Sequence, residues 1–215
     1  MAKLNGYLED YAYLIEGLLE LYQTTFDPRW SVAAQEPVET MLKHFAGSES
    51  TLYNTCGDHQ TLITRPRDLQ DNATPSGNAM AVTALLKLAG LTDEVHYVDI
   101  AHEALTLIQP LLAQYPLGFG QWLQALAYVL TEPREIAIVG DPDSADTQAL
   151  LSVFCDGYRP FQVVALGPPG LGGTTVPLLQ DRDTAAEHAA AYVCRGFAFR
   201  TPAREPETLQ RLLAV

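Results

Sequence analysis

The chain has 215 residues, 47% of them hydrophobic and 18% charged, a composition that excludes intrinsic disorder and is typical of a folded globular protein. Its net charge of −13 excludes a basic face, because residues 1–133 hold 16 acids and 6 bases and residues 134–215 hold 10 and 7; we therefore expect no binding to nucleic acid or to an anionic membrane. There is no apolar run of roughly 20 residues that could span a membrane and no signal peptide, and the three cysteines are widely spaced, which predicts a cytoplasmic protein with reduced thiols.

The first two predicted helices form a hairpin. Between residues 7 and 22, apolar side chains recur at the three- and four-residue spacing of an amphipathic helix. The second helix is expected to start with Asp27 as N-cap and Pro28 as its first residue, and to run to Phe45 with a kink at Pro37. The short connection favours antiparallel packing of the two helices.

A stretch without helical periodicity follows, at residues 50–72, and it predicts turns with a short extended piece at 61–64. Three more helices are predicted at residues 76–89, 93–109 and 119–130. The first and third of these are apolar on most sides, whereas the second has one polar face. We therefore predict two layers, with the first, third and fifth helices of the chain inside and the second and fourth outside.

The pattern changes after Pro133. Two short apolar strands, 135–139 and 161–166, flank a helix at 144–154, which is the order of a parallel strand-helix-strand unit. A third strand near 190–197 and a last helix at 205–213 complete a small lobe. The fold class predicted is thus mainly α, with a curved array of helix hairpins in residues 1–133 and a small α/β lobe with a short parallel sheet in residues 134–215.

Polar residues gather at the predicted N-termini of the inner helices, which lie at one end of such an array. Asn5, Glu9 and Asp10 lie at the start of the first predicted helix. Asp71, Asn72, Ser76 and Asn78 lie at the start of the helix predicted at 76–89, and Gln121 lies near the start of the helix predicted at 119–130. Asp, Asn and Ser are also the residues that cap helices, so capping alone is one interpretation. The other is a ligand site in one shared concavity, with Asn72, Ser76, Asn78 and Gln121 as binding residues.

Of the acids at the start of the first helix, Asp10 borders the apolar arc of the helix, whereas Glu9 lies on the polar strip. Asp10 is therefore expected to be the less exposed of these two acids.

No metal or cofactor site is predicted. The five histidines form no HxH or HExxH pattern, and no two cysteines have CxxC spacing, which argues against zinc. No GxGxxG motif follows Asp141, and the glycine-rich stretch 167–173 lacks the Lys-Ser/Thr ending of a phosphate-binding loop, which argues against nucleotides. Cys155 and Cys194 are expected to pack as small apolar residues.

Several segments carry a family resemblance. They are GYLEDYAYLIEGLLELYQTTFDPRW, RPRDLQDNATPSGNAMAV, FGQWLQAL, REIAIVGD and AYVCRGFAFRTPA. Together these resemble the C-terminal part of the YyaL type of thioredoxin-domain-containing proteins, a group with a spermatogenesis-associated member in animals. The resemblance extends over essentially the whole chain.

The resemblance implies that the helix hairpins form part of an α/α toroid similar to six-hairpin glycosidases and sugar epimerases. Glycoside cleavage needs two carboxyl groups about 5 to 9.5 Å apart, so the resemblance makes Asp10 and Asp71 the candidate catalytic pair. It also implies that this chain lacks the thioredoxin-like domain and about half of the toroid. A second cysteine is expected near position 199, where this chain has Phe199, so no redox role is expected for Cys194.

Two functions remain open at this point. The first is a scaffold or interaction module that docks on a thioredoxin-like partner domain or on a second copy of the chain. The alternative is a carbohydrate-binding or carbohydrate-processing cleft with a small sugar as ligand. Whether the chain is an enzyme is left open; if it is one, the resemblance implies a carbohydrate-active enzyme.

Overall fold

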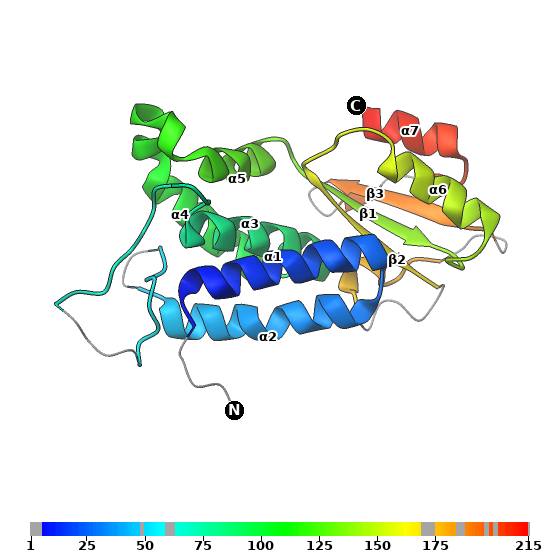
Figure 1. Ribbon diagram of the computed structural model, residues 1–215. Helices are drawn as coiled ribbons and strands as arrows, with labels where there is room; N and C mark the ends of the chain where they lie inside the picture. Colours follow the sequence, from blue (N-terminus) through cyan, green and yellow to red (C-terminus); the bar gives the residue numbers. More distant parts are fainter. Residues whose placement is uncertain are drawn as a thin grey trace. The chain divides into compact units, whose positions relative to one another are not determined.

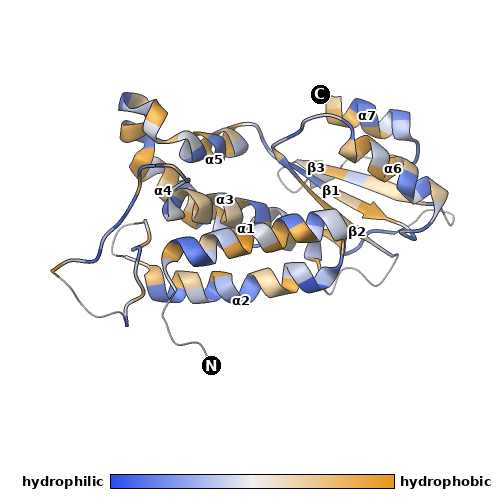
Figure 2. Cartoon of the chain, viewed as in Figure 1, coloured by the Kyte–Doolittle hydropathy of each residue, from blue (hydrophilic) through white to orange (hydrophobic). Residues whose placement is uncertain are grey.

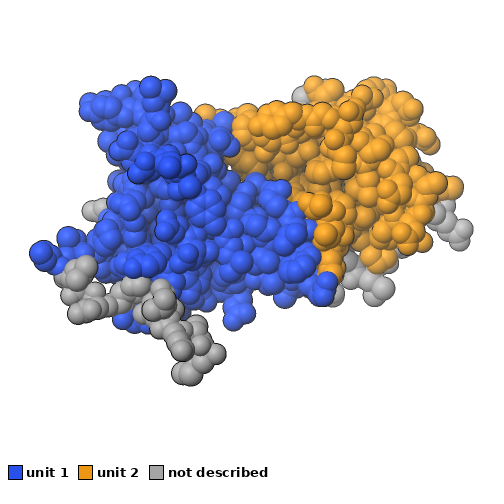
Figure 3. All heavy atoms as spheres, in the orientation of Figure 1, with its two compact units in different colours: residues 1–22, 29–89, 94–127 blue, residues 23–28, 90–93, 128–215 orange. Residues whose placement is uncertain are grey.

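The computed structural model describes residues 6–47, 50–58, 63–168, 175–183, 188–195, 198–199 and 202–214, and shows a mainly helical chain with a small α/β part, which confirms the predicted fold class (Figure 1). Two compact units are distinguished (Figure 3). We call residues 1–22, 29–89 and 94–127 the helical unit, and residues 23–28, 90–93 and 128–215 the α/β unit. Among the described residues, no helix combines the length and the apolar character needed to cross a membrane.

The first two helices are α1 (Leu8–Thr25) and α2 (Pro28–Phe45). Each buries one stripe at alternating steps of three and four residues, consisting of Leu8, Ala12, Ile15, Leu19 and Tyr22 in α1 and Ser31, Ala34, Val38, Met41 and Phe45 in α2. The opposite sides are mostly polar but also expose Leu14 and Leu21 of α1 and Val32 of α2, so that both helices show hydrophilic and hydrophobic residues in Figure 2. Phe26 adopts a positive φ of 54° in the connection, and α2 passes through Pro37 without ending.

The other helices of this part are α3 (Gly77–Thr92), α4 (Val95–Gln114) and α5 (Gly120–Leu130), with a short 3₁₀ helix η1 (Pro116–Gly118) before α5. From residue 78 to residue 91, α3 is buried everywhere except at Thr83 and Lys87. α4 instead buries one face and exposes the other. The sequence prediction ended this helix at residue 109, but α4 continues through Pro110 because Leu112 extends the buried stripe by one turn.

The two partly exposed residues of α3 connect it to its neighbours. Lys87 Nζ lies 2.7 Å from a carboxylate oxygen of Glu20 and also contacts Glu16, both on α1. Thr83 Oγ1 accepts a hydrogen bond of 2.8 Å from Gln121 Nε2 on α5. Burial lowers the pKa of Lys87, but the two glutamates more than offset this and raise it above its usual value. These bonds place α3 beside α1 and beside α5.

The α/β unit contains a four-stranded sheet in the order β2-β1-β3-β4. Its strands are β1 (Arg134–Val139), β2 (Gln162–Gly167), β3 (Ala190–Arg195) and β4 (Ala198–Phe199), and its helices are α6 (Ala145–Cys155), α7 (Pro206–Ala214) and the 3₁₀ helix η3 (Pro177–Leu179). β1 and β2 are parallel, as predicted, with α6 between them in the chain. β3 is antiparallel to β1, because the chain re-enters the sheet at the end where β1 and β2 finish, with Ala190 opposite Val139. The sheet is therefore mixed rather than wholly parallel.

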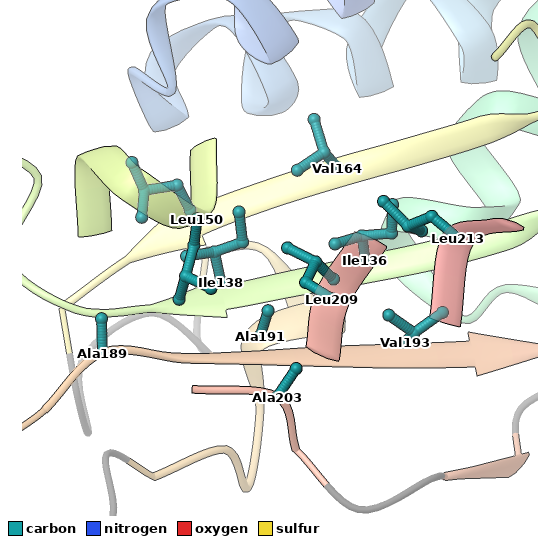
Figure 4. Close-up of a cluster of buried hydrophobic side chains, with 11 residues drawn as sticks. Ile136, Ile138, Leu150, Val164, Ala189, Ala191, Val193, Ala203, Leu209 and Leu213 are labelled. Carbon is teal, nitrogen blue, oxygen red and sulfur yellow. The ribbon is translucent and has the colours of Figure 1, made fainter. Parts of the chain in front are cut away.

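One face of this sheet packs against α6 and α7 (Figure 4). The buried side chains are Ile136 and Ile138 of β1, Val164 and Leu166 of β2, Ala191 and Val193 of β3, Leu150 of α6, and Leu209 and Leu213 of α7. Asp146 ties α6 to β3, because its carboxylate accepts the N–H of Ala189 at 2.7 Å. The Ser144 side chain and the Ala189 N–H are the main hydrogen bonds that lower the pKa of Asp146, to about 2.

The opposite face of the sheet carries a buried polar cluster, which we call the Glu135 cluster. Glu135 of β1 is 6% exposed and stands opposite Cys194 of β3, and Arg182 donates a hydrogen bond of 3.5 Å to Cys194 Sγ. Burial raises the pKa of Glu135 to about 7; the charge of Asp93 adds to this shift and that of Arg182 opposes it. Burial likewise raises the pKa of the Cys194 thiol.

Candidate functional site: a polar cavity in the helical unit

An open cavity of about 870 Å³ lies in the helical unit. Three stretches of chain line it: residues 7–9 at the start of α1, residues 54–55, and residues 66–77 except Ala73. The last stretch ends in the first residue of α3. Most of the lining side chains carry hydrogen-bonding groups, and Tyr7 offers an aromatic ring that is 50% exposed.

The N-termini of α1 and α3 meet beside this cavity. A Cβ atom added to Gly77 would lie 3.1 Å from the backbone nitrogen of Glu9 and 3.3 Å from its Cα. A side chain here would force the two helix starts apart by a few tenths of an ångström, so glycine favours their close approach. The N–H of Leu8 donates to the carbonyl of Asn54 at 2.9 Å, which fixes the second stretch against the start of α1.

Asp71 joins two helix N-termini. Its Oδ1 accepts the N–H of Ser76 at 2.8 Å, just before α3, and its Oδ2 accepts the N–H of Gln121 at 2.8 Å, in the first turn of α5. Its own N–H donates to the carbonyl of Gly118 at 2.8 Å. A carboxylate is favoured here because the first N–H groups of a helix have no partner within the helix. Both oxygens of this predicted catalytic residue are thus occupied by main-chain amides.

The following residues build the turn that leads into α3. Asn72 accepts the N–H of Ala73 at 3.0 Å with its side chain and donates its own N–H to Thr74 at 2.9 Å. Pro75 accepts a bond of 3.1 Å from the hydroxyl of Tyr13 on α1. Ser76 caps α3, because its Oγ accepts the N–H of Ala79 at 3.2 Å.

Asn78 lies beneath the cavity and is only 2% exposed. Its Oδ1 accepts the N–H of Leu52 at 2.7 Å, and its Nδ2 donates to the carbonyls of Leu52 at 2.9 Å and Asp68 at 3.3 Å. Trp122 of α5 is fully buried, and its indole N–H donates to the carbonyl of Leu69 at 2.7 Å. The loop that lines the cavity is therefore supported by side chains of α3 and α5.

Asp10, the other predicted catalytic residue, lies in the first turn of α1. Its Oδ2 accepts the backbone N–H of Tyr7 at 2.8 Å, as the third residue of a helix does in a capping box. Asp10 and Glu9 are both exposed, and Glu9 is the one that lines the cavity. Of the predicted site residues, the lining includes Asp71, Asn72 and Ser76, and does not include Asp10, Asn78 or Gln121.

Sequence reasoning missed the part of the cavity that residues 54–55 and 66–70 form, because these residues have no periodicity that predicts a structure. Asp68 lines the cavity, and its backbone N–H donates a hydrogen bond of 2.8 Å to Oδ1 of Asn54. The guanidinium groups of Arg65 and Arg67 lie 4.1 and 4.2 Å from the ring centre of Tyr53. The concentration of charged and polar residues in RPRDLQD was the available signal.

The lining has an acidic balance. The lining contains three carboxylates, those of Glu9, Asp68 and Asp71, and one cationic side chain, that of Arg67. Within the part of the chain that the structure describes, no three His, Cys, Asp or Glu side chains are grouped so that they could hold a metal ion. The lining offers a ligand carboxylate oxygens as hydrogen-bond acceptors, and amide and hydroxyl groups that both donate and accept.

Position 199 also bears on the predicted chemistry. The register of β3 and β4 pairs Cys194 directly with Phe199. The place where the resemblance implies a second cysteine is thus the cross-strand neighbour of Cys194, and in this chain that neighbour has no thiol.

Comparison with known proteins places the chain among homologues of one protein. No family model matches the sequence. Spermatogenesis-associated protein 20 of Homo sapiens and that of Rattus norvegicus are each 30% identical to it over 214 residues, which cover 97% of this chain and 27% of theirs. An uncharacterized protein of Caenorhabditis elegans is 22% identical over 98% of this chain and 29% of its own length.

The chain thus spans little more than a quarter of the length of these relatives. The identity is spread over nearly the whole chain, which confirms the resemblance expected from the sequence segments. The chain is therefore similar, over nearly its whole length, to one segment of spermatogenesis-associated protein 20.

Proposed function

We propose that the helical unit binds a small polyhydroxylated molecule, a sugar, in the cavity lined by residues 7–9, 54–55 and 66–77. The observation that carries this proposal is the lining itself: hydrogen-bonding groups surround a space of about 870 Å³ beside one half-exposed aromatic ring, Tyr7. Cavities of about 300 to 1,000 Å³ are typical of small-molecule sites. Hydroxyl groups fit such a lining because they both donate and accept hydrogen bonds.

The charges favour a neutral or an amine-bearing sugar over a phosphorylated one. Glu9 and Asp68 are exposed carboxylates, and a phosphate placed near them would be repelled. The guanidinium of Arg67 lies against the ring of Tyr53, which limits its reach.

Binding is favoured over cleavage. A glycosidase needs one carboxyl group that gives up a proton and a second that acts as base or nucleophile. Asp71 uses both of its oxygens for main-chain amides, and Asp10 uses one for the N–H of Tyr7. The carboxylates of the two predicted catalytic residues are therefore engaged in hydrogen bonds to the main chain, which favours a structural role for them.

A thermal-shift series with glucose, N-acetylglucosamine, glucosamine and glucose 6-phosphate tests the proposal. A ligand that binds only the native state raises the Tm, so at least one of the first three sugars is expected to raise it and the phosphate is not. Gln70→Ala, in the lining, should remove the shift, whereas Gln109→Ala, an exposed glutamine of α4, should keep it. The absence of any shift at millimolar sugar, or a shift for the phosphate alone, would contradict the proposal.

The exposed apolar side chains of α4 and the turn after it favour a second function, that of an interaction module. Leu107, Leu111 and Tyr115 follow one another at four-residue steps and are each at least 36% exposed, and Leu117 is fully exposed. Exposed apolar patches mark contact sites between proteins. A second copy of the chain is the occupant to test first, with a thioredoxin-like domain as the other.

Light scattering coupled to size exclusion tests this second function. The expected result is a dimer or a larger oligomer. Leu111→Lys should give a monomer. Val32→Lys, which changes another exposed apolar residue on α2, should leave the oligomer intact. A monomer of the unchanged protein at micromolar concentration would count against self-association.

A further inference from the structure

The longest wall of the cavity, residues 66–72, contains no helix or strand. Its main-chain groups form no ladder of hydrogen bonds: Pro66 and Asp71 bond to the main chain of Asn54 and Gly118, and side chains supply partners for others. Two consecutive carbonyls of this wall are held from below: that of Asp68 by Asn78 of α3 and that of Leu69 by Trp122 of α5. Both side chains are buried, and neither lines the cavity.

Asn78 holds a second wall as well. It binds both the N–H and the carbonyl of Leu52, two residues before the lining pair 54–55. One amide therefore bridges the chain at Leu52 and the chain at Asp68. An aspartate could keep only the bond from the Leu52 N–H, because it has no N–H to donate to the two carbonyls.

We propose that Asn78 and Trp122 are positioning residues of the cavity, which set its affinity for a sugar by fixing the two walls without touching the ligand. This inference rests on the proposed function. Asn78 fixes the distance between the chain at Leu52 and the chain at Asp68, and Trp122 fixes the distance of residues 66–72 from α5. The side chains of Asp68 and Leu69 line the cavity, so a shift of their carbonyls moves the groups that the ligand meets.

The first arm of the test needs no ligand. Hydrogen exchange of the full chain is followed in Asn78→Asp, in Trp122→Phe and in Trp30→Phe, which changes the same residue type on α2. Trp122→Phe is expected to speed exchange in 66–72 by about tenfold, and Asn78→Asp to do so in both 50–55 and 66–72, because the lost partners open the walls locally. Trp30→Phe should change neither.

This selectivity separates support of the walls from general stability. Exchange that rises equally in the walls and in the inner turns of α3 and α5, or that does not change in either variant, would overturn the inference.

The second arm measures affinity for the sugar that raised the Tm. Trp122→Phe and Asn78→Asp should each weaken binding by about tenfold or more, with Trp30→Phe unchanged. Sugar binding that is unchanged in both variants would overturn the inference even if exchange rises. If no sugar binds the unchanged protein, the proposed function fails, and the exchange arm still decides whether Asn78 and Trp122 hold the walls.

The chain also provides an internal reporter. Trp30 and Trp122 are its two tryptophans, so the Trp30→Phe protein emits from Trp122 alone. The emission of that variant should change when sugar binds, because the indole N–H is bonded to the cavity wall. An emission that stays constant through a titration in which the Tm rises would contradict a link between wall and ligand.

Discussion

The helical unit and the α/β unit bury polar side chains in different ways. In the helical unit, the buried amide of Asn78 and the indole of Trp122 are neutral groups that bind main-chain atoms of a loop. In the α/β unit, the Glu135 cluster brings together ionisable groups of Glu135, Arg182 and Cys194 beneath a sheet. Neutral hydrogen bonds persist at any pH near neutrality, whereas a buried carboxyl makes stability depend on protonation. The difference predicts that the supports of residues 66–72 do not change near neutral pH, whereas the stability of the α/β unit depends on the protonation of Glu135.

The largest expected effect concerns the neutral support. Trp122→Ala removes a fully buried indole and leaves a cavity, so the free energy of unfolding should fall by about 3 to 5 kcal/mol. Trp30→Ala, at a partly exposed position of α2, is the matched control and should cost much less. Urea unfolding followed by circular dichroism measures both. Equal losses of unfolding free energy in the two variants would contradict the claim that Trp122 supports the helical unit more than Trp30 does.

The next effect sharpens the contrast in pH response. Glu135 has a pKa of about 7 in the folded chain against a usual value of 4.5, so the folded state binds the proton more tightly than the unfolded state. Its stabilising contribution is fully present below about pH 4.5 and is lost as the pH rises through about 7. The loss over this window should be on the order of 2 to 3 kcal/mol.

Glu135→Gln is the variant that checks this assignment. It should flatten the pH dependence between about 4.5 and 7, because the amide does not titrate. Trp122→Phe, in the helical unit, adds no titratable group and should leave the pH dependence due to Glu135 in place. A slope that persists in Glu135→Gln would assign the pH response to other groups.

The smallest effect separates capping from binding at the start of α1. Asp10→Ala should lower the free energy of unfolding by about 1 kcal/mol, because the Tyr7 N–H loses its acceptor, and should leave sugar affinity unchanged. Glu9→Ala should instead weaken sugar binding and leave the free energy of unfolding nearly unchanged, since Glu9 lines the cavity. Denaturation and sugar titration of the two variants compare them directly. Loss of sugar binding in Asp10→Ala without loss of stability would restore Asp10 as a ligand-binding residue.

Helices α1, α2 and α4 could be predicted from periodicity because each buries one stripe with regular spacing, whereas α3 was marked by a long apolar run that is buried on most sides. The ends were harder: α4 runs five residues beyond the predicted residue 109, since a proline inside a helix is tolerated where the buried stripe continues at Leu112. The direction of β3 could not be predicted, because the apolar run that marks a strand is the same in both directions. Only the place where the chain re-enters the sheet decides it.

The candidate site was predictable in its residue types and not in their roles. Asp71, Ser76 and Asn78 stand where helix N-termini need partners, which the sequence indicates. The sequence does not indicate that Asp71 accepts from two different helices, or that Asn78 points away from the cavity towards Leu52, because both depend on contacts between distant segments. The walls formed by 54–55 and 66–70 were missed for the same reason.

Hydrogen exchange with and without the sugar that raises the Tm tests the central claim most directly, because it locates the ligand on the chain. Sugar binding in the cavity predicts slower exchange in residues 50–55 and 66–77 and at the start of α1, with the α/β unit unchanged. Slower exchange confined to the α/β unit or to α4, or no change anywhere at saturating sugar, would contradict the account.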